Sequence, residues 1–144
     1  MIRRVLPLIA FFTFSFSSFA QHTLRVEISG ANELIGEMSV AIYNQKDAFL
    51  DFKRVYKAKT QKVYNATNLL SFTNLEQGEY AIAVFHDANA NQKLDKNFLG
   101  IPKEALGFSI GKMKAFGPPT FEECKFVLDQ NKTIKIALSK WWFL

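Results

Sequence analysis

Short runs in which apolar and polar residues alternate are the feature that most constrains the fold of this chain. Leu24, Val26 and Ile28 alternate with polar residues, and the run from Met38 to Tyr43 repeats the pattern. Successive side chains of a β-strand point to opposite faces of the sheet, so a period of two predicts a strand with one buried face. Glycine follows the first run and asparagine the second, which is typical of strand ends. Both runs are therefore predicted strands.

The strongest strand signal lies at Glu79 to His86, where both faces are apolar. The residues on its two faces are Tyr80, Ile82 and Val84 on one and Ala81, Ala83 and Phe85 on the other. A strand without a polar face is covered by other elements on both sides. We therefore expect this strand at the centre of a sheet.

Four further runs are predicted strands, and a turn separates the last two. The runs are Lys62 to Asn65, Leu69 to Thr73, Cys124 to Leu128 and Ile134 to Leu138. Asp129 to Lys132 has the composition of a hairpin turn. About seven short strands joined by turns predict an all-β fold, an antiparallel β-sandwich with one long ordered loop.

One segment breaks the alternation. Between Asp47 and Lys57, the apolar residues Phe49, Phe52 and Val55 recur at spacings of three. Spacings of three and four are helical, so a short helix or an irregular excursion is expected there.

Residues 1–20 have the composition of a secretory signal peptide. Arg3 and Arg4 precede an apolar run, and Ser18-Phe19-Ala20 is a small-x-small cleavage site. The apolar run is shorter than the about 20 residues that span a bilayer. We therefore expect cleavage after Ala20, a periplasmic or secreted protein, and a single β-sandwich domain over residues 21–144 without a transmembrane segment.

The charge and cysteine content exclude several classes of partner. The formal net charge is +5, and without the charges of Arg3 and Arg4 it is 5 − 2 = +3. The lysines are scattered rather than clustered, which argues against nucleic-acid binding. The single cysteine, Cys124, cannot form an internal disulfide, and its apolar surroundings predict a buried structural thiol. We expect a monomer.

A short polar loop follows the central strand and has the spacing of a cation site. Calcium takes roughly six to eight oxygen ligands, which a tight loop supplies from alternate side chains and one backbone carbonyl. The candidate ligands are Asp87, Asn89, Asn91, the Lys93 backbone carbonyl and Asp95, with Glu104 as an additional ligand. The pattern therefore predicts a weak calcium site.

Two residues depart from the calcium loop of helix-loop-helix proteins. Gln92 stands where that loop requires glycine, and Phe98 stands where it has a bidentate glutamate. An affinity of roughly 0.1 to 1 mM is therefore expected. The alternative is a loop of Asx turns, in which these side chains cap their own backbone without a metal.

His86 suggests a different function, a small metal-dependent hydrolase using His86, Asp87 and Glu104. However, no cysteine or glutamate lies at a ligand spacing from His86. The chain also has no serine elbow and no glycine-rich phosphate loop, and adjacent Glu122 and Glu123 would face opposite sides of a strand. We therefore expect a structural histidine at a strand end and a protein that is not an enzyme.

The segment from Asn97 to Pro119 is rich in glycine and proline, which precludes a long helix. We expect an ordered loop that packs Phe98, Leu99 and other apolar residues against one end of the sandwich. Long ordered loops often carry function. The candidate ligand or partner surface consists of Phe98, Pro102, Phe108, Phe116, Pro118 and Pro119.

Four linked motifs carry a family resemblance. They are Val84-Phe85-His86-Asp87-x-Asn89-x-Asn91-x-x-x-Asp95, Asn97-Phe98-Leu99-Gly100-Ile101-Pro102-Lys103-Glu104, Gly107-Phe108-Ser109, and Phe116-Gly117-Pro118-Pro119-x-Phe121-Glu122. In this order they resemble the small secreted bacterial proteins of domain-of-unknown-function family 2141, whose members commonly have glycine in place of Gln92. The resemblance covers essentially all of residues 21–144. It implies an exported β-sandwich of the immunoglobulin or transthyretin-like kind and no established activity.

These observations lead to one main hypothesis for function. The chain would be a non-enzymatic module of the cell envelope or secretome, in which calcium at Asp87 to Asp95 orders the segment Asn97 to Pro119 as a surface for an envelope protein or a glycan. A further alternative is a structural adaptor that recruits its partner through the aromatic residues of Trp141 to Leu144.

Overall fold

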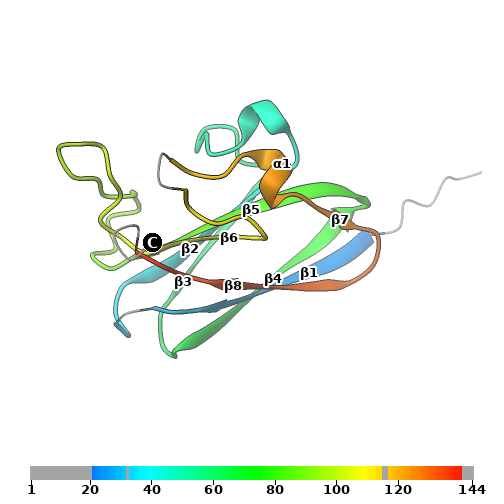
Figure 1. Ribbon diagram of the computed structural model, residues 1–144. Coiled ribbons are helices and arrows are strands. Elements are labelled where there is room, and N and C mark those ends of the chain that lie inside the picture. Colours follow the sequence, from blue (N-terminus) through cyan, green and yellow to red (C-terminus); the bar gives the residue numbers. More distant parts are fainter. Residues whose placement is uncertain (1–20, 32, 115–116, 141–144) are drawn as a thin grey trace, which may run out of the picture.

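The computed structural model describes residues 21–31, 33–114 and 117–140. The predicted signal peptide, Phe116 and Trp141 to Leu144 therefore lie outside the described residues. The elements are β1 (Gln21–Ser29), β2 (Glu37–Tyr43), the 3₁₀ turn η1 (Lys46–Ala48), β3 (Lys57–Lys62), β4 (Thr67–Glu76), β5 (Gly78–Asp87), β6 (Leu106–Phe108), α1 (Phe121–Cys124), β7 (Phe126–Leu128) and β8 (Lys132–Ala137). The strands form two layers (Figure 1). In the part of the chain that is described, no helix is long and apolar enough to cross a membrane.

The predicted all-β fold is confirmed, and β5 occupies the predicted central place. One sheet has the order β4-β1-β8 and the other the order β3-β2-β5-β6, with β7 also paired to β5. Within the described residues eight strands are present, close to the expected number. The pairs are antiparallel except for β1 and β8, which run parallel.

The predicted hairpin at Asp129 to Lys132 is wrong. β7 pairs with β5 in one sheet, whereas β8 pairs with β1 in the other, so this connection crosses from layer to layer. Asn131 holds the crossing in place, because its Oδ1 accepts a hydrogen bond of 2.7 Å from the Thr23 backbone N–H. Turn composition indicates that the chain reverses, but it does not specify which strand the chain pairs with next.

Two predicted local structures are also wrong. The strand expected at Lys62 to Asn65 lies earlier, as β3, whose lysine-rich sequence is that of an exposed edge strand rather than an alternating one. Glu122 and Glu123 lie in the helical turn α1 rather than in a strand. Thr120 and Glu123 have the spacing of a capping box, which favours a helix start over an extended chain.

The core between the sheets is built from the predicted alternating residues. Leu24, Val26 and Ile28 of β1 and Ile82 and Val84 of β5 are all almost fully buried there. Burying side chains of this size stabilises the fold by about 1.5–3 kcal/mol each. This core holds the two layers together.

A second apolar cluster covers the outer face of the five-stranded sheet. It includes Ala81, Phe85 and Phe108, together with Phe121 and Cys124 of α1. Residues 44–56 and 109–124 pass over this face (Figure 1). β5 is therefore apolar on both faces because each face has its own cover.

Candidate functional site

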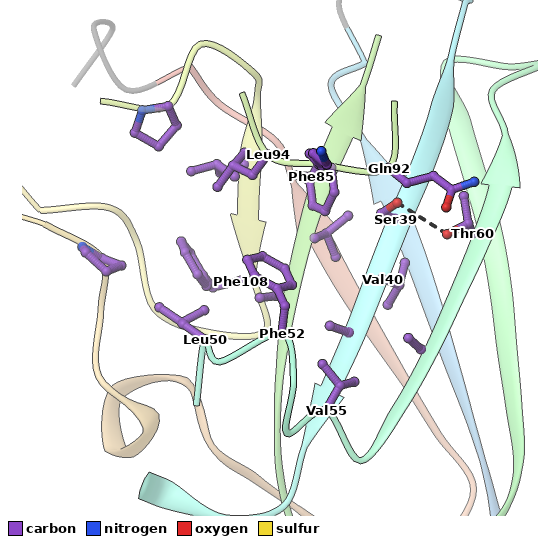
Figure 2. A pocket seen from close by; sticks show the side chains of 18 of the residues that line it. Ser39, Val40, Leu50, Phe52, Val55, Thr60, Phe85, Gln92, Leu94 and Phe108 are labelled. Carbon is purple, nitrogen blue, oxygen red and sulfur yellow. Dashed lines mark hydrogen bonds between the residues drawn. The ribbon is translucent and has the colours of Figure 1, made fainter. Parts of the chain in front are cut away.

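A pocket of about 910 Å³ opens between the outer face of the five-stranded sheet and the segments that cover it. Figure 2 shows it running along β2 and β5, with Gln92 at one end and Leu50 and Val55 at the other. Pockets of roughly 300–1,000 Å³ with apolar linings are typical of sites for small molecules.

The floor of the pocket follows from the strand register. Ala58 of β3 pairs with Ala41 of β2, which pairs with Ala83 of β5. Three adjacent strands therefore present a methyl group at the same level, while Phe108 of β6 pairs with Ala83 and bounds the row. A row of small side chains leaves a trough where larger residues would fill the space beneath the covering segments.

Residues 46–56 form one wall of the trough. Arg54 braces this excursion, because its guanidinium pairs with Asp51 Oδ2 at 2.9 Å and with Asp47 Oδ2 at 2.8 Å. The excursion places Phe52 edge-on to Phe85, with 6.3 Å between the ring centroids. The predicted short helix or irregular excursion is confirmed as the turn η1 followed by a loop.

One end of the pocket is polar. The hydroxyls of Ser39 and Thr60 lie 3.3 Å apart on neighbouring strands, beside Gln92 (Figure 2). Lys93 and Lys96 line the pocket from the loop that follows β5. Among the described lining residues, the charged ones are Lys59, Lys93 and Lys96, and none is acidic.

The predicted ligand or partner surface is brought together only in part. Pro102, Phe108 and Pro118 line the pocket, Pro119 is buried beside Gly111, and Phe116 lies outside the described residues. Phe98 does not line the pocket.

The prediction that Phe98 and Leu99 pack against the sandwich is wrong, because they are 94% and 67% exposed. They sit at the tip of a tight turn in which the Asn97 carbonyl accepts the Gly100 N–H at 2.9 Å. Asn97 Oδ1 also accepts the backbone N–H groups of Leu99 and Ile101. This turn is closed by its own hydrogen bonds, so its apolar tip points to solvent.

Asp87 anchors the predicted cation loop from inside the protein. It is fully buried at the end of β5. Its Oδ1 accepts the Asn91 N–H at 3.1 Å, and its Oδ2 accepts the Gln92 N–H at 2.6 Å. Both carboxylate oxygens therefore hold the loop backbone.

The other predicted ligands lie in the same loop. Asn89 and Asn91 donate from their side-chain amides to the two oxygens of Asp95, at 2.8 and 3.1 Å. Asn89 Oδ1 accepts the Asn91 N–H, and Asn91 Oδ1 accepts the Lys93 N–H, which are Asx turns. The self-capping alternative therefore describes the hydrogen bonds of this loop.

Glu104 approaches the loop from the following segment, as its selection as an additional ligand required. Its Oε1 accepts the Ala88 N–H at 3.3 Å and its Oε2 the Asp95 N–H at 3.1 Å, so it ties the two ends of the loop together. Burial and the neighbouring charge of Asp87 raise the pKa of Glu104. In the ranges that the structure describes, no group of three or more His, Cys, Asp and Glu side chains is placed to hold a metal ion.

The backbone of the loop nevertheless has the shape of a calcium loop. Gln92 has φ 62° and Ala90 has φ 55°. Gln92 stands at the position where the calcium loop requires glycine for its sharp turn. The missing glycine thus does not prevent this turn.

His86 is buried at the end of β5, and its Nε2 lies 2.7 Å from the Ile35 carbonyl oxygen. This is the expected environment of a structural histidine at a strand end. Burial raises the pKa of the Cys124 thiol to about 11, and the buried structural thiol expected from the sequence is confirmed.

Most residues of the pocket floor and of one wall lie in the first half of the chain, where we found no sign of function in the sequence. Ala41 and Ala58 are ordinary strand residues, and only the register places them beside Ala83. The sequence signal that could have found the pocket is the apolar excursion with Phe49, Phe52 and Val55, which needs an apolar surface to cover.

Comparisons with known proteins agree with the sequence motifs. The family model described as "Uncharacterized protein conserved in bacteria (DUF2141)" matches residues 26–136. Neither the curated proteins nor the solved structures contain a match. The chain therefore belongs to DUF2141, a family of uncharacterized proteins conserved in bacteria, which confirms the resemblance seen in its motifs.

Proposed function

We propose that this protein is a non-enzymatic binding module of the bacterial cell envelope or secretome that takes an apolar ligand in the outer-face pocket. The observation that carries this proposal is the cross-strand row Ala58, Ala41 and Ala83 beneath apolar walls. Export through the signal peptide at residues 1–20 is part of the same proposal.

The lining favours an apolar ligand over a glycan. The walls consist of aliphatic and aromatic side chains such as Leu50, Phe52 and Leu94, and the polar groups gather at one end. Burying one methylene group gains about 0.8 kcal/mol, so a chain of ten gains at most about 8 kcal/mol before the cost of association is subtracted. The trough thus suits an apolar chain or a flat ring system.

We further propose that the Asp87 to Asp95 loop binds calcium and thereby fixes one rim of the pocket. Gln92, Lys93 and Leu94 belong to this loop and line the pocket. Rotating the side-chain amides of Asn89 and Asn91 would present their oxygens in place of their N–H groups, and Asp95 would then bind the ion rather than those amides. Calcium would in this way restrain the residues that contact the ligand.

Filling the trough tests the ligand proposal. The neutral fluorescent probe N-phenyl-1-naphthylamine is expected to bind the wild-type protein saturably, and Ala83→Leu should weaken binding at least about tenfold, the equivalent of about 1.4 kcal/mol. Ala66→Leu is the matched control, because Ala66 is exposed away from the pocket. Equal binding by both variants, or no saturable binding to the wild type, would contradict the proposal.

Thermal unfolding with and without calcium tests the loop. Calcium at about a hundred times its Kd should stabilise the fold by about 2.7 kcal/mol, and Asp95→Asn should remove this gain. Asp95 is a better target than Asp87, because the buried Asp87 carboxylate holds the loop backbone whether or not calcium binds.

Asp129→Asn serves as the control for lost negative charge, since Asp129 lies in the connection between β7 and β8. A calcium-dependent shift that persists in Asp95→Asn, or that is absent from the wild type, would reject the calcium site and leave the loop as a set of Asx turns.

A further inference from the structure

We infer that the ligand of this pocket is a single-chain amphiphile with an anionic head group, a carboxylate or a phosphate. The inference rests on the proposed function and adds the chemical class of the ligand. The head group would lie at the end formed by Gln92, Ser39 and Thr60, and the apolar chain would run over the alanine row toward Leu50 and Val55 (Figure 2).

The charge of the lining carries the inference. Every charged residue among the described lining residues is a lysine. Lys59 is engaged elsewhere, because its ammonium donates to the Ser71 carbonyl and lies 5.3 Å from the centre of the Phe72 ring. Lys93 and Lys96 remain, and both are exposed and form no ion pair within the described part of the chain.

The acidic groups of the same loop face away from this task. Asp87 and Glu104 are buried and accept backbone N–H groups, and Asp95 accepts the side-chain amides of Asn89 and Asn91. None of the three lines the pocket. The loop thus directs its carboxylates to its own backbone and amides while its two lysines border the apolar trough.

The polar floor at the same end matches such a head group. The hydroxyls of Ser39 and Thr60, 3.3 Å apart, can each donate to an oxygen of a carboxylate or phosphate. Hydroxyl donors, a side-chain amide and two ammonium groups therefore border one end of the trough. The other end is aliphatic, so the pocket has the polarity of an amphiphile.

A competition experiment tests the inference on the full chain after removal of residues 1–20. N-phenyl-1-naphthylamine is bound first and then displaced at low ionic strength by dodecanoate, dodecyl phosphate, dodecanol or dodecyltrimethylammonium, each below its micelle concentration. The two anions should displace the probe at concentrations about 5- to 30-fold lower than dodecanol, as expected for two partly exposed ion pairs. Equal or better displacement by dodecanol or by the cation would overturn the inference.

Removing the two lysines locates the effect. In the double variant Lys93→Gln and Lys96→Gln, the advantage of the anions over dodecanol should disappear, while displacement by dodecanol stays within about twofold of wild type. The matched control is Lys112→Gln with Lys135→Gln, which removes the same charge from positions outside the pocket. A control pair that loses the preference equally would assign it to net charge and contradict the site.

Two further arms separate the sources of the ligand and the two proposals. Comparing dodecanoate with a lysophosphatidylglycerol of the same chain length distinguishes a free acid from a lipid head group. A wild-type protein that binds the probe without any anion preference would sink only this inference, whereas failure to bind the probe would sink the proposed function as well. Probe binding that appears only after deletion of residues 141–144 would make that segment the occupant and contradict both.

Discussion

Single residues in the loop after β5 show that backbone conformation can be conserved in shape without the usual residue. Gln92 adopts φ 62°, a left-handed conformation that costs a residue with a Cβ roughly 1–2 kcal/mol. The backbone N–H of Gln92 donates to buried Asp87, and this hydrogen bond holds the strained residue in place. The loop thus makes the calcium-type turn at a cost that a glycine would not incur.

Replacing Gln92 with glycine should therefore stabilise the protein. Relief of the left-handed strain outweighs the loss of about 0.4–1 kcal/mol through the greater entropy of the unfolded chain, so a net gain of about 0.5 kcal/mol is expected. Urea unfolding measures it. Gln45→Gly is the control, because Gln45 has φ −135° and gains nothing from glycine, so this variant should be less stable than wild type. A destabilised Gln92→Gly protein would show that the strain is not significant.

At the scale of elements, the short turn α1 joins the covering segment to β7. Glu123 Oε2 accepts the Thr120 backbone N–H at 2.7 Å, and its Oε1 lies 2.7 Å from the Lys114 ammonium. These contacts connect the start of α1 with the segment before it. The ammonium of Lys114 and the Thr120 N–H hold the pKa of Glu123 at about 2, below its ordinary value of 4.5.

This low pKa predicts a defined acid sensitivity. A carboxyl group whose pKa is lower in the folded state stabilises the fold above its unfolded pKa, and the contribution is lost as the pH falls. For Glu123 the loss should occur between about 4.5 and about 2. Glu123→Gln keeps the capping amide acceptor but removes the titration, so its stability should fall less steeply in this window.

Urea midpoints measured across this pH range test the effect. Glu33→Gln is the control, because Glu33 is exposed and forms no ion pair among the described residues. Parallel profiles for wild type and Glu123→Gln would reject the role of this carboxylate in acid stability.

At the scale of the whole molecule, the two sheets meet along a seam between β6 and the end of β8. Leu106 and Ser139 exchange backbone hydrogen bonds of 2.9 Å, which joins the outer-face cluster to the opposite sheet. Gly107 lies at this seam, where an added Cβ would come within 2.5 Å of Ile136 Cγ2 and 3.2 Å of the Ala137 carbonyl oxygen. The layers approach this closely only because residue 107 has no side chain.

Gly107→Ala should therefore separate the layers and destabilise the fold by about 1–3 kcal/mol, the usual cost of overpacking. Gly78→Ala is the matched control, because a Cβ there meets its nearest neighbour at 3.6 Å, an ordinary contact. Chemical denaturation of both variants measures the difference. Equal stability of the two would mean that the seam yields at little cost.

The sequence alone determined the parts of this protein that depend on local pattern. Period-two alternation located most strands and their buried faces, the two-sided apolar run identified β5 as central, and the spacing of Asp87, Asn89 and Asn91 identified a loop whose side chains cap one another. Linked motifs identified the family. These features depend on neighbours in the chain, so the chain order records them.

Only the tertiary structure decided which strands are partners and where the pocket lies. The parallel pairing of β8 with β1 and the row Ala58, Ala41 and Ala83 follow from register, which joins residues far apart in the chain. Phe98 and Leu99 are exposed because their turn closes on itself. Local alternation determines which face of a strand is buried, whereas the packing of distant segments decides what covers that face and where space is left for a ligand.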